Sequence, residues 1–380
     1  MGVRKYEMDW VRVLVFDVLI VWHAALFFVS WESLVQWDLP MKNRVQVEGL
    51  ALPMLFVRQW RLPILFVVSG MGSRFALSDR SGWTFLKNRI LRLLLPCAFG
   101  ILVVVPPQIY LERVSQGTFA GSYFQFYPRF FQGVYPEGNF SWQHLWFLPY
   151  LFLMTLVALP LFLWVRKRLG AGMQKMGKVL KRHPVLLFVP VGATFLVELT
   201  LEKRFPLTMA LTDDWYAFSS YFLCFLTGFL LASSGEAVWE AFRKVRSVAL
   251  LCGVLSWPLV RSGILQGSFS PVLYLAKALH VWSWILAIFG FASRYLNRPS
   301  SLLRYRNRAV YPLYILHYTI LLWLAFLMGD RDLPVLLKLP LLVLGTYGIS
   351  GLLYEFVIRR VSWIGLLFGY PSVKCTNTIS

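Results

Sequence analysis

The sequence predicts an all-α membrane protein, a bundle of about ten transmembrane helices that forms a single membrane-embedded domain over residues 1–380. Three observations support this fold class. Of the 380 residues, 58% are hydrophobic and only 15% are charged, whereas roughly a quarter of the residues of a soluble domain are charged. Long apolar runs recur throughout, with no internal repeat, low-complexity tract or soluble domain between them. The basic residues fall mainly in alternate loops.

The candidate spans are runs of roughly 17–25 apolar residues, each bounded by charged or turn residues. They lie near residues 11–29, 60–77, 90–109, 145–165, 185–201, 216–233, 248–262, 272–291, 310–328 and 335–354. The seventh run is short, and the RQWRLP sequence interrupts the start of the second. No small-residue cleavage site follows the first run, which predicts a retained helix instead of a removed signal peptide.

The distribution of Lys and Arg predicts the orientation of these spans. Twenty-six of them lie in loops on the side of the N-terminus, and eight lie in loops on the opposite side. Basic residues favour cytoplasmic loops, so we expect both termini in the cytoplasm of a multi-pass protein of the cell (inner or plasma) membrane. The net charge of +20 then reflects topology, and no nucleic-acid partner is expected.

Several classes of site are not indicated. The four cysteines, at 97, 224, 252 and 375, are far apart and form no CxxC pair, so neither a disulfide framework nor a thiol metal site is expected. The sequence has no HExxH, no acidic pair at metal-ligand spacing and no Gly-rich phosphate loop. We therefore expect no metal and no permanently bound cofactor, which leaves acid/base or transport chemistry.

The first apolar run carries three ionisable residues. Arg12 and His23 are eleven residues apart, which places them within about 20° on one helix face and about 16 Å apart along its axis. Asp17 lies between them, off that face. Ionisable groups in a span are costly and are therefore candidates for function. The alternative is that Arg12 anchors the helix at the interface and that neighbouring helices satisfy Asp17 and His23.

Further histidines lie in or beside other spans. His144 opens HLWFLPY at the outer mouth of the fourth span, and His280 lies within the eighth. His317 lies some seven residues inside the cytoplasmic end of the ninth, in YPLYILH. A neutral imidazole accepts a proton from a hydroxyl, so a histidine in a protein-lined cavity is a candidate general base. The two depths predict that His144 and His317 do not touch.

Two surface features have alternative interpretations. The outer loop at 110–144 is rich in aromatic and turn residues, which suits an ordered cap over a pocket, and aromatic faces also stack on sugars; an interfacial aromatic belt is the alternative. Arg89 and Arg92, at i and i+3, are expected to share a helix face and could clamp phosphates. Binding of anionic lipid explains the same charges.

Several motifs together resemble the acyltransferase 3 family of integral-membrane O-acyltransferases, most closely its glucan biosynthesis protein C branch. Besides the spacing of Arg12 and His23, the chain has RLPILFVVSG at 61–70, NRILRLLLP at 88–96, HLWFL at 144–148, YPLYILH at 311–317 and LLYEFVIRR at 352–360. They follow one another in the family order and cover nearly the whole chain.

The resemblance implies an acyl-CoA-dependent acyltransferase that acylates a hydroxyl of a carbohydrate or of a lipid-linked glycan. His23 and Arg12 would be the catalytic pair, with His23 as the base and Arg12 facing the donor's phosphates. Donor binding would involve four residues of two motifs: Arg89, Arg92, Ser69 and Gly70. Five residues are candidates for acceptor binding or support: His144, Trp146, His317, Glu355 and Asp17.

Two other functions remain open from the sequence. A secondary transporter or flippase for an anionic solute would use Asp17, Glu198, Lys277, His280 and His317 as a proton relay or substrate site, although no inverted repeat is present. A sensor or assembly protein that binds acyl-CoA or glycan without turnover is the third alternative. For the acyltransferase, the choice between an acetyl and a succinyl group stays open: Arg58 and Arg61 would suit a dicarboxylic donor, but we expect them at the outer end of their span.

Overall fold

The computed structural model describes residues 5–30, 41–78, 80–267, 270–329 and 331–370. Within these residues the regular secondary structure is helical, and one isolated bridge joins Val134 and Phe140. In the described part of the chain, ten helices are long and apolar enough to cross a membrane, which confirms the predicted all-α membrane fold. The described cysteines, Cys97, Cys224 and Cys252, are free thiols, and Cys375 lies outside the described residues.

The ten candidate spans agree with the predicted runs but extend beyond several of them. They are Tyr6–Phe28, Glu48–Leu77, Gly82–Ser115, Gln143–Arg168, Pro184–Leu201, Trp215–Ser233, Ala237–Leu265, Pro271–Tyr295, Ser301–Gly329 and Val335–Ile358. The expected interruption of the second span is wrong: α2 (Ala51–Leu77) continues through Arg58 and Arg61, with Pro63 inside it. Neighbouring helices and local adjustments allow proline within a membrane helix.

Two compact units make up the chain, each assembled from separate stretches. The first unit is Met1–Val15, Leu55–Leu86 and Leu153–Leu303. The second unit is Phe16–Met54, Lys87–Phe152 and Arg304–Ser380. Several helices, including α1 (Tyr6–Ala25), therefore contribute to both. The single membrane-embedded domain over 1–380 stays a prediction.

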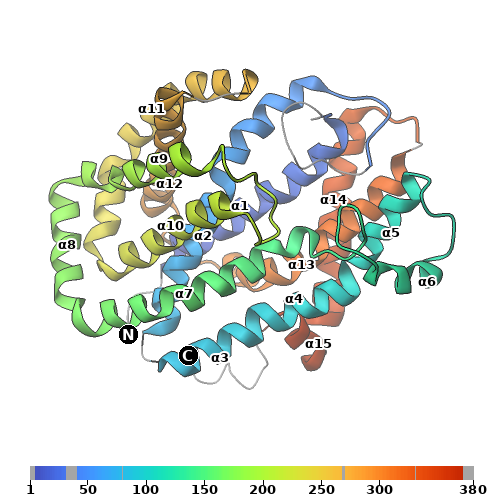
Figure 1. Ribbon diagram of the computed structural model, residues 1–380. Helices are drawn as coiled ribbons and strands as arrows, with labels where there is room; N and C mark the ends of the chain where they lie inside the picture. Colours follow the sequence, from blue (N-terminus) through green and yellow to red (C-terminus); the bar gives the residue numbers. More distant parts are fainter. Residues whose placement is uncertain (1–4, 31–40, 79, 268–269, 330, 371–380) are drawn as a thin grey trace. The chain divides into compact units, whose positions relative to one another are not determined.

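In the first unit, α11 (Ala237–Leu265) and α12 (Pro271–Tyr295) pack along each other, and α9 (Pro190–Leu201) packs on α12 and α10 (Trp215–Ser233) (Figure 1). The seventh span, expected to be short, is the 29-residue α11. Glycine brings α2 and α10 together, because a Cβ on Gly70 would lie 2.0 Å from the carbonyl oxygen of Phe225. The basic loop after the fourth span forms α8 (Gly170–Arg182).

The third span, which belongs to the second unit from Lys87 onward, alternates between α-helical and π-helical geometry. It runs through α3 (Gly82–Arg89), a π-segment (Ile90–Leu94), α4 (Leu95–Phe99), a second π-segment (Gly100–Val104) and α5 (Pro106–Ser115). Pro106 and Pro107 have no N–H to donate to the preceding turn. In that preceding turn, the carbonyl oxygen of Leu102 accepts a hydrogen bond from the hydroxyl of Tyr127, at 3.1 Å.

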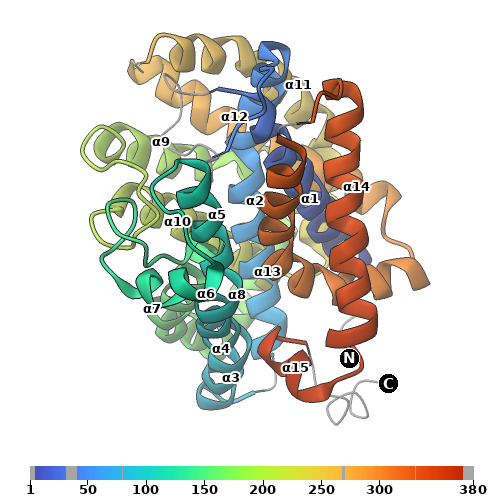
Figure 2. The same cartoon turned by 90° about the vertical axis from the view of Figure 1, so that its right-hand side faces the viewer.

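The C-terminal part of the second unit consists of α13 (Ser301–Gly329), α14 (Val335–Leu353), a π-segment (Tyr354–Ile358) and the short α15 (Ser362–Leu367). Figure 2 shows α13 and α14 beside α1. Asp17 of α1 joins the three helices, because it accepts hydrogen bonds from Arg306 of α13 and from the hydroxyl of Tyr347 of α14.

Candidate active site: a cluster of three histidines

Three histidines from separate segments meet in the second unit, and we call His23, His144 and His317 the histidine cluster. Nδ1 of His23 lies 3.1 Å from Nε2 of His317, and the two rings stack with centroids 5.2 Å apart. The His144 ring meets the His317 ring edge-on at 5.4 Å. The prediction that His144 and His317 do not touch is therefore wrong.

The position of His317 within its helix explains this error. The sequence places the start of the ninth span near residue 310, but α13 begins at Ser301. His317 is therefore sixteen residues into the helix, about 24 Å along its axis, instead of seven residues from its cytoplasmic end. Charged residues in its first turns hid the start of the helix, since a hydropathy scan detects only the apolar part.

Hydrogen bonds to backbone and side chains hold His144 in place. Its Nε2 lies 3.0 Å from the carbonyl oxygen of Ile315, and its Nδ1 lies 3.3 Å from the amide nitrogen of Gln108. The hydroxyl of Tyr314 donates to the carbonyl oxygen of His144 at 2.6 Å. The preceding residue, Gln143, has a φ of 42°, a left-handed conformation that non-glycine residues rarely adopt. His144 is thus fixed by α13, α5 and its own strained turn.

Aromatic side chains enclose the histidine cluster. The Tyr318 ring lies 5.1 Å from the His23 ring and 5.2 Å from the His144 ring. Phe16 meets His317 edge-on at 5.7 Å, and Trp22 meets His23 at 5.5 Å. His317 is fully buried, whereas His23 is half-buried. Of the two hydrogen-bonded histidines, His23 is therefore the more accessible one.

Sequence reasoning missed three polar residues around the cluster: Gln108, Tyr314 and Thr319. Thr319 donates to the carbonyl oxygen of Val104 at 2.8 Å and accepts from Gln108 at 2.7 Å. The sequence signal for Gln108 is an amide side chain next to two prolines in an apolar run. The signal for Tyr314 is its i, i+3 relation to His317, which places both on one side of α13.

Three of the five predicted supporting residues lie outside the cluster. Asp17 bonds to Arg306 and Tyr347, as described above. Trp146 is buried against the Tyr150 ring, at 5.1 Å. Glu355 accepts from Tyr305 at 3.0 Å and from Arg359 at 2.6 Å.

The predicted donor-binding residues fall into two groups. In the first unit, Arg12 points toward α2, where its guanidinium lies 3.8 Å from the Cβ position of Gly72, one turn from Ser69 and Gly70. In the second unit, Arg92 is exposed and Arg89 is half-buried. Their expected i, i+3 alignment does not hold strictly, because π-helical geometry begins at Ile90 and changes the angular spacing of the side chains.

A separate polar group lies in the first unit, and we call Glu198, Glu202, Tyr216 and Lys277 the ion-pair network. The ammonium of Lys277 lies 2.7 Å from Glu198, 2.5 Å from Glu202 and 2.9 Å from the Tyr216 hydroxyl. His280, one turn further along α12, instead contacts the carbonyl oxygen of Gly253 and the hydroxyl of Ser256. The residues that a transporter would use as a proton relay thus bond to different partners.

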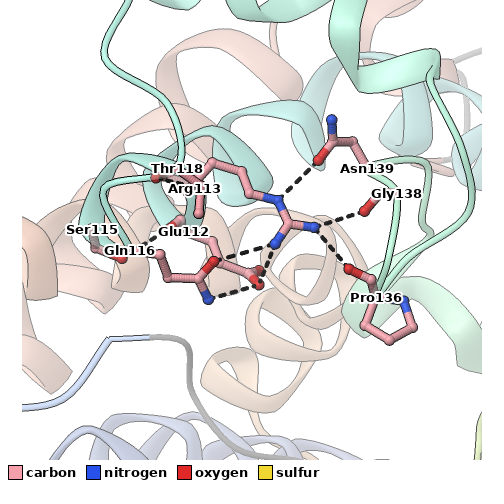
Figure 3. Close-up of polar contacts among 8 residues, drawn as sticks. All are labelled: Glu112, Arg113, Ser115, Gln116, Thr118, Pro136, Gly138 and Asn139. Atoms are coloured by element: carbon pink, nitrogen blue, oxygen red, sulfur yellow. Dashed lines mark hydrogen bonds and ion pairs between the residues drawn. The ribbon is translucent and has the colours of Figure 1, made fainter.

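The outer loop at 110–144 is held by Arg113 at the end of α5 (Figure 3). Its guanidinium donates to Asn139 at 2.9 Å and to the carbonyl oxygens of Pro136 and Gly138 at 2.9 and 2.7 Å. Burial and the nearby Glu112 raise the pKa of Tyr135 to about 12, so this residue stays neutral at ordinary pH. The loop therefore folds back on the end of its own helix.

Comparison with known proteins gives one family. The family model of acyltransferase 3, described as an acyltransferase domain, matches residues 5–355. Glucans biosynthesis protein C of Escherichia coli O6:K15:H31 and that of Shigella dysenteriae serotype 1 are each 22% identical over 405 residues, covering 98% of this chain and 97% of the relative. The protein of that name from Salmonella heidelberg is 21% identical over 390 residues. No solved structure matches the chain.

Proposed function

The chain belongs to the acyltransferase 3 family, and from this premise we propose that it is an integral-membrane O-acyltransferase with His23 as its general base. It transfers an acetyl or succinyl group from cytosolic acyl-CoA to a hydroxyl of a carbohydrate. The proposal is carried by one observation: a half-buried histidine inside a transmembrane helix, hydrogen-bonded to a second histidine that is fully buried.

The proposed chemistry needs one proton acceptor. Nε2 of His23 takes the proton of the acceptor hydroxyl while the hydroxyl oxygen attacks the carbonyl carbon of the thioester. The tetrahedral intermediate collapses, the carbon–sulfur bond breaks and an ester forms. The proton on Nε2 then passes to the leaving thiolate, which gives free CoA. Positioned proton transfer of this kind contributes about 10²- to 10⁴-fold to a rate.

Arginines on the predicted cytoplasmic side suit the donor. Arg89 and Arg92 lie at the start of the third span, and Arg12 lies near the start of the first. Arginine binds phosphate through a planar, bidentate set of donors. We propose that these side chains bind the phosphates of CoA, and that Ser69 and Gly70 allow the close helix packing that the donor-binding region requires.

The relatives support a carbohydrate acceptor, because they are named for the biosynthesis of glucans. The outer loop supplies aromatic faces of the type that stack on sugars: Tyr123, Phe124, Tyr127 and Phe131 lie in one stretch, and Phe124 is 85% exposed. We therefore propose that the acceptor is a glucan that approaches from the side of the membrane on which this loop lies.

Purified protein in nanodiscs tests the proposal. The release of CoA from acetyl-CoA and from succinyl-CoA is measured with a glucan oligosaccharide present, and mass spectrometry detects the acylated product. His23→Gln is compared with His183→Gln, the same change at an exposed histidine after α8. We expect turnover to be lost in the first variant and kept in the second. Full turnover by folded His23→Gln would contradict the role of His23, and solute uptake without thioester consumption would indicate a transporter.

A further inference from the structure

The hydrogen bonds of His317 determine which of its nitrogens carries the proton. Its Nδ1 lies 2.7 Å from the carbonyl oxygen of Tyr314. A carbonyl oxygen only accepts hydrogen bonds, so Nδ1 of His317 is protonated. In the neutral ring the lone pair is then on Nε2, which faces Nδ1 of His23 at 3.1 Å. His23 must therefore donate from Nδ1, and its own lone pair is on Nε2.

From this chain of bonds we propose that His317 is a positioning residue, which holds His23 in the tautomer whose Nε2 accepts the substrate proton. The inference rests on the proposed function of His23 and adds a defined partner to it. His317 supplies two effects. It fixes the ring orientation, and once His23 has taken a proton, the bond from its Nδ1–H to His317 is charge-assisted and therefore stronger.

The surroundings of His317 suit this role. It is fully buried, and its ring packs against Phe16 and His144, so its orientation is fixed by packing as well as by the Tyr314 carbonyl. His144 is unsuited to the same role, because its Nε2 donates to Ile315 and its Nδ1 accepts from Gln108. Both nitrogens of His144 are therefore already used.

Two substitutions at one position separate the hydrogen bond from the packing. His317→Phe keeps an aromatic ring but has no acceptor for His23 Nδ1. His317→Gln has a side-chain oxygen that reaches roughly the place of Nε2 and can accept from His23. We expect His317→Phe to lower kcat about 10²-fold with little change in the KM for acyl-CoA, and His317→Gln to recover most of that loss.

His280→Phe is the matched control, because His280 is also a fully buried histidine in a span, with its Nδ1 bonded to Gly253. It should keep the wild-type kcat. Folding of each variant is checked by gel filtration and thermal unfolding in detergent.

The outcomes distinguish this inference from the proposed function. Wild-type kcat in folded His317→Phe would overturn the role of His317 while leaving acyl transfer intact. Absence of acyl transfer by the wild type with every donor would overturn the proposed function. If His317→Phe does not fold, nitrogen-15 spectra of wild-type histidines decide the point, because a protonated Nε2 on His23 would contradict the assigned tautomer.

Discussion

Both the histidine cluster and the ion-pair network consist of polar side chains inside apolar spans, but their hydrogen bonds are arranged differently. In the network, the ammonium of Lys277 lies between two carboxylates and a hydroxyl, so opposite charges compensate one another within the group. In the histidine cluster, the bonds run in one direction, from His23 through His317 to a carbonyl. In the proposed tautomer, the lone pair of the half-buried His23 ring is on Nε2.

This difference shows why burial and charge alone do not identify a catalytic site. The network pairs a cation with carboxylates and is best explained as a structural link between α9, α10 and α12. In the cluster, His23 is the more exposed of the two hydrogen-bonded histidines, and the proposed tautomer makes it the proton acceptor. Two predictions test this distinction directly, and two further ones test smaller effects elsewhere in the fold.

The largest effect is expected in a double-mutant cycle within the cluster. His23→Gln should lower kcat by about 10²- to 10⁴-fold. Adding His317→Phe should lower it little further, because His317 acts through His23 and residues that act as a unit are not additive. Single-turnover rates of the four proteins measure the coupling. Full additivity of the two losses would show that His317 acts independently of His23.

In the ion-pair network, the expected effect is on stability. Lys277→Met leaves Glu198 and Glu202 without their shared cation, and removing one partner of a buried pair costs about 3–5 kcal/mol. Thermal and denaturant unfolding in detergent measure the loss, while kcat per folded molecule should be unchanged. Neutralising both carboxylates as well, with Glu198→Gln and Glu202→Gln, should restore most of the stability. A fall in kcat without a fall in stability would place the network in the chemistry.

A smaller loss is expected where α2 meets α10. Gly70→Ala places a Cβ 2.0 Å from the backbone oxygen of Phe225, and overpacking of this type costs about 1–3 kcal/mol. Gly348→Ala on α14 is the control, because a Cβ there meets nothing within 4 Å. Unfolding midpoints compare the two. Equal midpoints would mean that the helices separate without cost.

The smallest effect is expected in the outer loop. Arg113→Lys removes the planar donor set that binds Asn139, Pro136 and Gly138, and each hydrogen bond is worth roughly 1 kcal/mol. Limited proteolysis should become faster within the loop. Arg129→Lys, the same change elsewhere in the loop, is the control. The Arg129 side chain lies over the Phe119 ring at 5.1 Å. Unchanged protease resistance in Arg113→Lys would show that other contacts hold the loop.

The sequence was sufficient for the class of fold, and it also predicted the residue that we propose as the general base. Hydropathy gives ten spans because each must be long and apolar to cross a bilayer. His23 was identifiable because an ionisable group within a span is costly. The partnership of His23 with His317 was not identifiable, since it depends on where α13 begins. That start lies among charged residues such as Arg304 and Arg306. A helix accommodates these residues, but a hydropathy scan leaves them out of the span.

The irregular geometry of the third span was equally invisible. A π-segment has no composition of its own, so the angular relation of Arg89 to Arg92 could be derived only for a regular α-helix. Gln108 illustrates a different limit. Its amide reaches His144 and Thr319, which are 36 and 211 residues away in sequence. Such contacts follow from tertiary packing, which no local pattern records.

The most direct test of the account is the protonation of the His23 nitrogens in the wild-type protein. Nitrogen-15-labelled histidine in nanodiscs gives ten ring resonances, because the chain has 5 histidines. His23→Gln removes two of these resonances and so assigns them. We predict a protonated Nδ1 and an unprotonated Nε2 on His23 at neutral pH. A protonated Nε2 with the lone pair on Nδ1 would contradict the account, because the atom proposed to accept the substrate proton would already carry one.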